Sequence, residues 1–314
     1  MLNRRHIRVK VMQILYAFKG SESDDFSKDQ KFLLFSIDNM YNLYLLLLSL
    51  LIEVQKRAEA DLHKKQKKHL ATAADKDPNR KFVNNEVLLL IKENIPLKNA
   101  LENHAIDAWE LDSEYVEIIF KAIVSSDLYE DYMKTRVSDF KEDKDFIVDV
   151  FKDVIAPNEK LYDYIEDKNL TWLDDLPTVN TTILKLLRKL KSTPSDGHFV
   201  PKLYKDDDDK KYAVDLFKKT LLKSTALNKE IALKTQNWDA DRIADVDFVL
   251  LQMAICELQN FPSIPVKVTM NEYLEIAKEY STPKSSIFIN GILDKLVKEY
   301  EAEGKLNKVG RGLM

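Results

Sequence analysis

Residues 246–296 read VDFVLLQMAICELQNFPSIPVKVTMNEYLEIAKEYSTPKSSIFINGILDKL. Apolar residues recur here every three to four positions, which is the period of an α-helix. Near the end of the stretch, Ser281 or Thr282 can cap a helix, and Pro283 suits a first helical turn. The stretch therefore predicts consecutive helices, at about residues 241–259, 267–280 and 283–302.

The same periodicity extends over most of the chain. Arg4 to Lys19 predicts a helix that Asn3 caps. Its main apolar stripe is Ile7, Val11, Ile14, Leu15 and Phe18. Further helices are expected at about residues 25–56, 85–106, 112–137, 142–155, 158–168, 177–191, 211–222 and 225–235. No alternating apolar and polar run is long enough to require a sheet, so the expected fold class is all-α.

Composition narrows the possible functions. The 314 residues include only six glycines, whereas turn-rich β-proteins and phosphate-cradling loops need glycine. No GxGxxG or GxxxxGK[ST] motif occurs. The single cysteine, Cys256, excludes an intramolecular disulfide and fits a reducing compartment. With 48 basic and 52 acidic residues, the net charge of −4 does not identify a partner, so the distribution of charge must be considered.

No group of residues predicts catalysis or metal binding. None of the five histidines stands beside another ligand at metal-binding spacing, and His63 and His69 flank a lysine run that would repel a cation. Cys256 lies in an apolar stretch, where a buried thiol is usually inert. The Ser281–Lys284 S-x-x-K pattern lacks the companion motifs of its hydrolase class. We therefore expect no catalytic residue, cofactor or metal.

Positive charge is concentrated at the N-terminus. No acidic residue precedes Glu22, and the basic residues before it are Arg4, Arg5, Arg8, Lys10 and Lys19. Cations at a helix N-terminus oppose the macrodipole, and phosphates would offset that cost. The alternative is a disordered basic start without a ligand. The apolar Val9, Met12 and Tyr16, opposite the main stripe, predict that the helix is central or meets a protein partner.

A second candidate lies at the start of the last predicted helix. Phe288 shares a flank with Lys284 and Lys295, near a helix start that carries hydroxyl groups. An aromatic ring between lysines suits an unstacked base and its phosphate. The alternative is that Phe288 packs against a neighbouring helix.

No segment predicts a membrane span. The longest apolar run, Leu43 to Ile52, has about half the length that a bilayer requires, and it predicts a buried helix. The N-terminus resembles a secretory signal only superficially, because Lys10 and Gln13 interrupt its apolar part. We expect a soluble, cytoplasmic protein.

An internal repeat is a further possibility. Residues 143–191 align without gaps with 209–257 at a shift of 66 residues. The pairs include Asp143/Asp209, Phe151/Phe217, Ile165/Ile231, Trp172/Trp238, Asp175/Asp241 and Leu184/Leu250. The alternative is two sets of amphipathic helices that align through their periodicity alone.

The two ends of the chain resemble the NusB family of transcription antitermination factors. RRHIRVKVMQILYAF, residues 4–18, resembles the family's arginine-rich first helix with its Leu–Tyr pair. The C-terminal match has fixed spacings over about fifty residues. Its pieces are Ala254–Leu258, Ile264–Pro265, Asn271–Glu272, Glu275, Ala277, Lys278, Ser285–Phe288, Asn290–Gly291 and Leu293–Lys295. The resemblance covers residues 1–20 and roughly 209–300.

The resemblance implies a function in RNA binding. Such proteins bind a boxA-type single-stranded RNA together with a small-subunit ribosomal protein, also called NusE. The complex joins the RNA polymerase elongation complex with other Nus factors and supports transcription of ribosomal RNA genes. The resemblance and the charge pattern together make the candidate RNA-binding residues Arg4, Arg5, Arg8, Lys10, Tyr16, Tyr280, Lys284, Ser285 and Phe288. The sequence departs from the family at His6, Tyr280 and Lys284; Lys284 should favour RNA.

The resemblance also divides the chain. We expect a NusB-like helical bundle made of residues 1–24 and 206–303, enlarged by a helical insertion at 25–205 and followed by a flexible tail at 304–314. Within the insertion, the polar and basic residues 61–81 predict an exposed linker.

Two other functions stay open. One is the RNA-recruiting domain of a ribosomal RNA cytosine methyltransferase system, although that enzyme requires a glycine-rich cofactor loop and catalytic cysteines downstream. The other is a protein-interaction scaffold that does not bind RNA.

Overall fold

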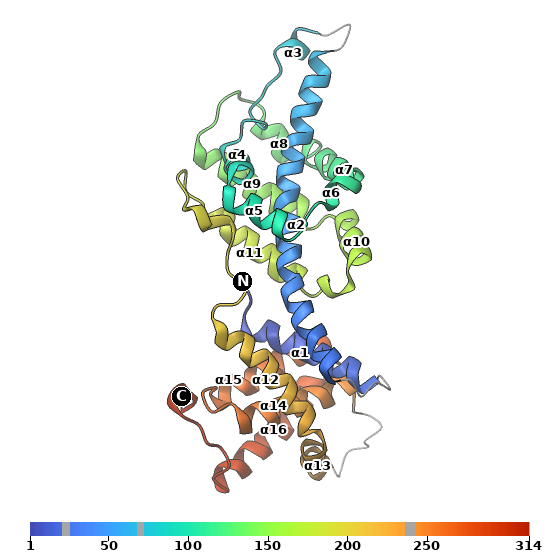
Figure 1. The fold of residues 1–314 in the computed structure, drawn as a ribbon, viewed down its shortest axis with the longest axis vertical. Coiled ribbons are helices and arrows are strands. Elements are labelled where there is room, and N and C mark those ends of the chain that lie inside the picture. The colour runs from blue at the N-terminus through green and yellow to red at the C-terminus, as the bar shows by residue number, and fades with distance from the viewer. Residues whose placement is uncertain (21–25, 68–71, 236–242, 314) are drawn as a thin grey trace. The chain divides into compact units, whose positions relative to one another are not determined.

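A computed structural model describes residues 1–20, 26–67, 72–235 and 243–313, and every regular element in these ranges is a helix. The all-α prediction is confirmed. The chain divides into two compact units. The terminal unit contains Leu2–Ile37 and Tyr204–Met314, and the middle unit contains Asp38–Leu203 together with Met1 (Figure 1).

The terminal unit joins both ends of the chain. Its helices are α1 (Arg4–Gly20), the first part of α2 (Phe26–Gln66), α12 (Asp207–Leu222), α13 (Ser224–Lys234), α14 (Asp245–Asn260), α15 (Val266–Tyr280) and α16 (Ser285–Ala302). Helix α1 packs against α12 and α14, and α14 also packs against α13, α15 and α16. Residues 1–20 therefore lie against the C-terminal helices, as the sequence predicted.

Helix α14 is the centre of the terminal unit because it is apolar on nearly every side. All residues from Val249 to Leu258 are buried except Gln252. A helix that is apolar all round must lie inside a bundle. Helix α1 is likewise enclosed, because every residue from His6 to Met12 is buried. The apolar residues on both sides of α1 thus reflect a helix enclosed by its neighbours.

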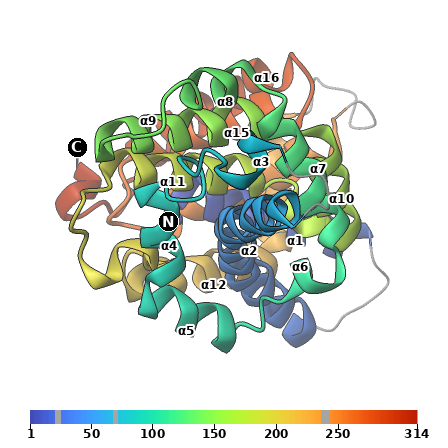
Figure 2. The same cartoon turned by 90° about the horizontal axis from the view of Figure 1, so that it is seen from above.

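The middle unit surrounds the apolar part of α2. Leu43 to Leu51 are all buried, so this run forms a core helix as predicted. By length and composition α2 could cross a membrane, but 78% of its most apolar window is buried inside the protein. Figures 1 and 2 show the shorter helices on several sides of α2. They are α3 (Ala73–Lys76), α4 (Glu86–Glu93), α5 (Ile95–Asn103), α6 (Ala108–Leu111), α7 (Ser113–Val124), α8 (Asp127–Tyr132), α9 (Phe140–Val150), α10 (Glu159–Lys168) and α11 (Leu176–Lys189).

Side-chain caps divide two of the predicted helices. The helix expected at 85–106 is α4 and α5, because Asn94 Oδ1 accepts a hydrogen bond from the Leu97 amide at 2.8 Å and starts a new helix. The helix expected at 112–137 contains α7 and α8, and Ser126 caps α8 in the same way. Local hydrogen bonds thus end helices that the apolar periodicity alone would continue.

The domain limits differ from the expected ones at three places. Residues 26–37 belong to the terminal unit, where Phe26 stacks on Phe217 with ring centroids 5.5 Å apart. The expected linker at 61–81 is shorter, because α2 continues to Gln66 and Lys81 is buried, donating to the Tyr132 carbonyl. The tail is attached by hydrogen bonds, since the Val309 amide donates to the Pro262 carbonyl at 3.0 Å.

The proposed repeat stays a prediction. A shift of 66 residues places α10 (Glu159–Lys168) on residues 225–234, which is nearly the whole of α13 (Ser224–Lys234). Two of its pairs, Trp172/Trp238 and Asp175/Asp241, include residues outside the described ranges. Agreement of helix limits fits duplication and also fits two amphipathic helix pairs of similar length.

Candidate nucleic-acid interface

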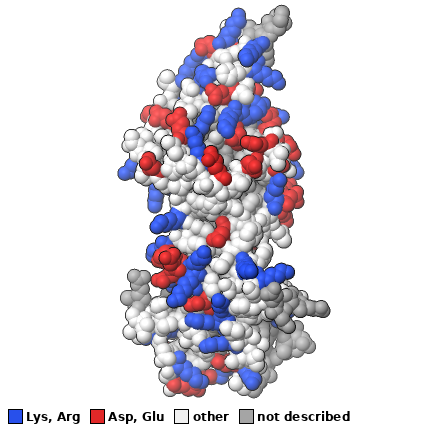
Figure 3. All heavy atoms as spheres, viewed as in Figure 1, with Lys and Arg blue, Asp and Glu red and all other residues white. Residues whose placement is uncertain are grey.

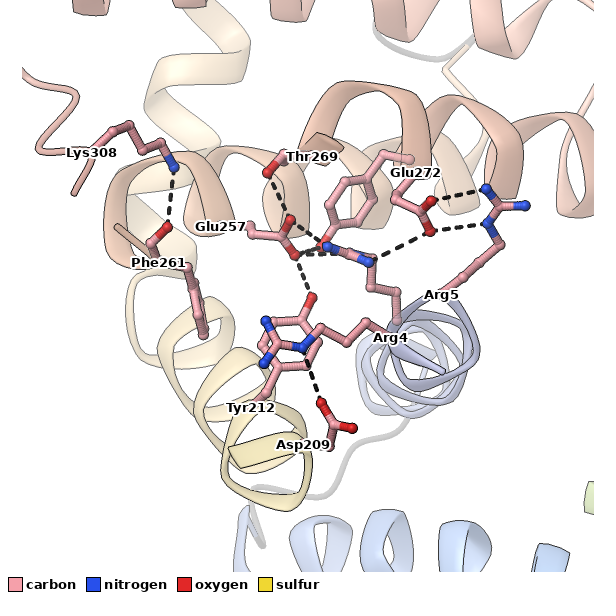
Figure 4. Close-up of polar contacts among 11 residues, drawn as sticks. Arg4, Arg5, Asp209, Tyr212, Glu257, Phe261, Thr269, Glu272 and Lys308 are labelled. Carbon is pink, nitrogen blue, oxygen red and sulfur yellow. Dashed lines mark hydrogen bonds and ion pairs between the residues drawn. The ribbon is translucent and has the colours of Figure 1, made fainter. Parts of the chain in front are cut away.

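The three arginines of α1 each meet a carboxylate of the terminal unit. Arg4 Nε lies 3.0 Å from Asp209 Oδ1, and Arg5 forms two hydrogen bonds with Glu272 at 3.0 and 2.9 Å. Arg8 forms two with Glu257, at 2.9 and 2.7 Å. Figure 4 shows these pairs converging from α1, α12, α14 and α15. The positive charge that the sequence concentrates in α1 is thus partly neutralised within the fold.

The Arg8–Glu257 pair is the buried end of this cluster. Their side chains are 2% and 0% exposed. Glu257 also accepts hydrogen bonds from Thr269 Oγ1 at 2.7 Å and from the hydroxyl groups of Tyr212 and Tyr273. Four side chains thus donate to this one carboxylate, and together they satisfy a charge that would otherwise be very costly to bury.

The charged state of Glu257 follows from these partners. Burial alone raises the pKa of the Glu257 carboxyl, but the charge and hydrogen bonds of Arg8 outweigh burial and leave the pKa below its ordinary value. Burial lowers the pKa of Arg8, whereas Glu257 raises it above its ordinary value. Both groups are therefore ionised at neutral pH, and the pair is a structural element of the core.

Arg4 and Arg5 differ from Arg8 because they remain accessible. Their side chains are 41% and 44% exposed. The hydrogen bonds that Arg5 donates to Glu272, the largest influence, raise the pKa of Arg5. Arg4 lies over the ring of Tyr212, with its guanidinium carbon 5.0 Å from the ring centroid. Two guanidinium groups therefore face solvent at the start of α1.

An open pocket of about 560 Å³ lies beside these two arginines. Arg4, Arg5 and Arg8 line it together with Glu272, and the turn before α15 supplies an apolar wall. The rest of the lining is Asn3, Ser263, Ile264, Pro265 and Val268. The accessible guanidinium groups of Arg4 and Arg5 make this pocket suitable for an anionic ligand.

Two predicted RNA-binding residues of α1 are buried. Arg8 and Lys10 are each only 1% exposed, and Arg8 is fully engaged with carboxylates, including Glu272 at 3.6 Å. Their burial argues against a phosphate contact by either side chain, because the ligand would have to enter the core. The helix period explains the difference: both residues lie on sides of α1 that neighbouring helices cover.

The remaining candidates lie around the start of α16. Lys284 is exposed, whereas Tyr280 and Phe288 are half-buried. Ser285 is 2% exposed, and its hydroxyl donates to Asp247 Oδ2 at 2.7 Å. Ser281 donates to the other oxygen of Asp247 at 2.6 Å. The Ser285 hydroxyl, which was expected to meet RNA, is thus bound to a buried carboxylate, and this contact ties the start of α16 to α14.

The predicted residues form two groups at opposite ends of α1. Helix α14 runs antiparallel to α1, since Arg8 meets Glu257 while Lys19 meets Asp245. The same helix binds the start of α16 through Asp247, so Lys284 and Phe288 lie near the Tyr16 end of α1. Arg5 and Tyr16 are eleven residues apart, which is roughly 16 Å along the helix. The predicted RNA-binding residues therefore lie along an extended surface.

Acidic residues lie between the two groups. Glu275 and Glu279 follow Glu272 on α15 and act on Arg5 with it, raising the pKa of the Arg5 guanidinium. On the face drawn in Figure 3, basic and acidic side chains are likewise interspersed. A nucleic acid would therefore find favourable charge at the arginines and at Lys284, and repulsion between them.

The carboxylate partners were not identified from the sequence. One signal was present: Glu257 is the only charged residue in the apolar run LLQMAICEL, residues 250–258. A lone carboxylate in a buried helix requires a cationic partner. Asp209 and Glu272 gave no such signal, because each lies among other charged or polar residues that are typical of a helix surface.

Other candidate chemistry is not supported by the geometry. Burial raises the pKa of the Cys256 thiol, which keeps it protonated and unreactive. Within the described ranges, no cluster of three or more histidine, cysteine, aspartate or glutamate side chains is arranged to hold a metal ion.

Comparisons with known proteins agree with this architecture. The profile of the NusB family matches residues 193–298. The transcription antitermination protein NusB of Salinibacter ruber is 37% identical over 138 residues, which are 42% of this chain and 86% of that protein. The NusB proteins of Chloroherpeton thalassium and Koribacter versatilis are 46% and 38% identical, over 88 and 100 residues. These matches cover 28% and 32% of this chain, and 42% and 68% of the relatives. No solved structure matches the chain.

Proposed function

The chain belongs to the NusB family, and from that membership we propose that it binds a boxA-type single-stranded RNA together with a small-subunit ribosomal protein. In this proposal the complex acts in the cytoplasm with the RNA polymerase elongation complex and other Nus factors, and supports transcription of ribosomal RNA genes. The chain itself performs no catalysis in this role. The terminal unit carries the RNA-binding surface.

The observation that carries the proposal is the accessible pair Arg4 and Arg5 beside an open pocket. Arg4 uses only Nε toward Asp209, so its two terminal nitrogens can donate to a phosphate. The whole chain has a net charge of −4, so long-range attraction to RNA is weak. Binding must therefore depend on such local contacts.

The second group supports the same function. Lys284 offers an exposed ammonium, Tyr16 is 47% exposed, and the half-buried Phe288 lies one helical turn after Lys284. An aromatic face with a neighbouring cation is the combination that binds unpaired nucleotides. An RNA strand that reaches from Arg4 to Lys284 would pass the acidic side of α15. Favourable contacts are therefore limited to the two groups of basic residues.

A specific observation favours a second candidate, the protein-interaction scaffold without RNA binding. All three arginines of α1 have carboxylate partners within the terminal unit, so their charge is already balanced. In this alternative the arginines only hold α1 in the bundle. The two candidates differ in whether Arg4 and Arg5 contact a phosphate.

Direct measurement of RNA binding separates the two candidates. The full chain is titrated with a boxA-like RNA, and with an RNA of the same length and base composition in shuffled order, each with and without the ribosomal protein. The proposal predicts preferential binding of the boxA-like RNA that the ribosomal protein strengthens. Equal and weak binding of both RNAs under both conditions would favour the scaffold.

A further inference from the structure

We infer that the pocket beside Arg4 and Arg5 holds one unstacked nucleotide of the bound RNA, with the base between Arg5 and the apolar wall and the phosphate on Arg4. This inference rests on the proposed RNA-binding function and assigns two different tasks to two neighbouring arginines. The pocket, of about 560 Å³, lies within the range of small-molecule binding sites.

Arg5 is built as a flat platform. Its Nε and one terminal nitrogen both bind Glu272, and this two-point contact fixes the plane of the guanidinium. The side chain is still 44% exposed and lines the pocket. Arginine planes of this kind stack on unpaired bases. Because Glu272 already occupies the edge of Arg5, the open face of the group is what remains for a ligand.

The opposite wall is apolar and partly exposed. Val268 is 43% exposed, although other residues of its helix, α15, are buried. Ile264, which is only 3% exposed, closes the pocket. Pro265 completes this wall. A planar base between this wall and Arg5 would remove apolar surface from water on both of its faces. The pocket therefore favours a nucleobase over a bare phosphate ion.

Arg4 is suited to the phosphate of the same nucleotide. Asp209 takes only its Nε, and the ring of Tyr212 supports the guanidinium from one side. Arg4 also lines the pocket, so the base and the phosphate of one nucleotide can be bound together. Three carboxylates balance the three arginines, so the phosphate is held by directed hydrogen bonds from the two terminal nitrogens of Arg4 and not by an excess of positive charge.

Substitutions that keep the charge distinguish the two tasks. Arg5→Lys retains a cation but removes the plane, so the affinity for boxA-like RNA should fall by roughly 5- to 150-fold while the salt dependence is unchanged. Arg4→Ala should lower the slope of log affinity against log salt by about 0.7. Arg188→Lys, on the exposed surface of the middle unit, is the matched control and should bind like the parent.

A second test examines the apolar wall. Val268→Ser should weaken RNA binding, whereas Val124→Ser, at a similar exposure of 40% in the middle unit, should not. In RNAs that carry a single 2-aminopurine, one position should brighten on binding because that base leaves the stack. The brightening should disappear with Arg5→Lys. Circular dichroism and thermal unfolding of each variant confirm that it is folded before binding is compared.

The outcomes separate the pocket from the wider function. If the parent chain binds boxA-like RNA but Arg5→Lys and Val268→Ser bind like the parent, the nucleotide pocket is refuted and RNA binding stands. If the parent does not bind RNA with the ribosomal protein present, the proposed function fails and the pocket assignment fails with it.

Discussion

Arg8 on α1 and Glu257 on α14 form a buried, two-point ion pair across 249 positions of the chain. The pair joins the first helix of the protein to the central helix of the terminal unit. Removing one partner would leave the other charge buried and unpaired, which is the costly case for a buried ion pair. The pair therefore holds α1 in the position from which Arg4 and Arg5 face solvent.

The first prediction concerns this pair. Glu257→Gln should destabilise the terminal unit by about 3–5 kcal/mol, because Arg8 would keep its charge in the core without a counterion. Hydrogen exchange followed by mass spectrometry measures each unit separately, through the α1 and α14 amides for Glu257→Gln and through the α7 amides for Glu117→Gln. Glu117→Gln is the control: its partner Arg57 is 32% exposed, and the loss there should stay below about 1 kcal/mol. Equal effects of both substitutions would contradict the prediction.

The second prediction concerns pH. The pKa of Glu257 lies below its ordinary value in the folded protein, so its contribution to stability is complete above the unfolded pKa of about 4.3. That contribution is lost as the pH falls through the folded pKa. The melting temperature of the terminal unit should therefore drop more steeply in acid for the parent than for Glu257→Gln. Parallel curves for the two proteins would show that other groups control acid unfolding.

The third prediction concerns the end of α5. Ala105 has φ = 50°, in the left-handed region that favours glycine. The Ile106 amide donates to the Leu101 carbonyl and the Ala105 amide to the Glu102 carbonyl, which is the Schellman arrangement. Ala105→Gly should stabilise the middle unit by about 1 kcal/mol, as measured by slower exchange of its amides. Ala105→Val should have the opposite sign, and stabilisation by valine would refute the argument.

The fourth prediction concerns the start of α16. Phe288→Ala should weaken RNA binding by about 1–3 kcal/mol without changing the salt slope, since stacking is not a charge interaction. Lys284→Ala should lower the slope of log affinity against log salt by about 0.7. Its loss of affinity should therefore be smaller at high salt than at low salt. Exposed residues of the terminal unit serve as controls: Ile287→Ala for the ring and Lys229→Ala for the charge. Identical behaviour of Phe288→Ala and Ile287→Ala would place the stacking elsewhere.

The helices of this protein could be predicted from local patterns. The stripe of Ile7, Val11 and Ile14 and the run Leu43–Ile52 indicated buried helices, and both are buried in the structure. The residues at which the helices begin and end were harder to predict. Asn94 and Ser126 end or begin helices through single side-chain hydrogen bonds, which apolar periodicity does not register.

The surface character of individual residues was harder to predict. Arg4, Arg5, Arg8 and Lys10 look alike in the sequence, yet two are accessible and two are buried. Polar composition likewise predicted an exposed linker up to Lys81, whose ammonium lies inside the middle unit. A charged side chain can be buried wherever a partner meets it, and the partner lies far away in the chain.

The sequence by itself determined the all-α class, the burial of α1 and α14, and the concentration of positive charge in the first helix. Only the tertiary structure decided how that charge is used. Asp209, Glu257 and Glu272 come from three other helices, and their positions leave Arg8 inside the bundle while Arg4 and Arg5 face an open pocket. Helix formation depends on neighbours within four residues, whereas the environment of a charge depends on groups brought close by folding.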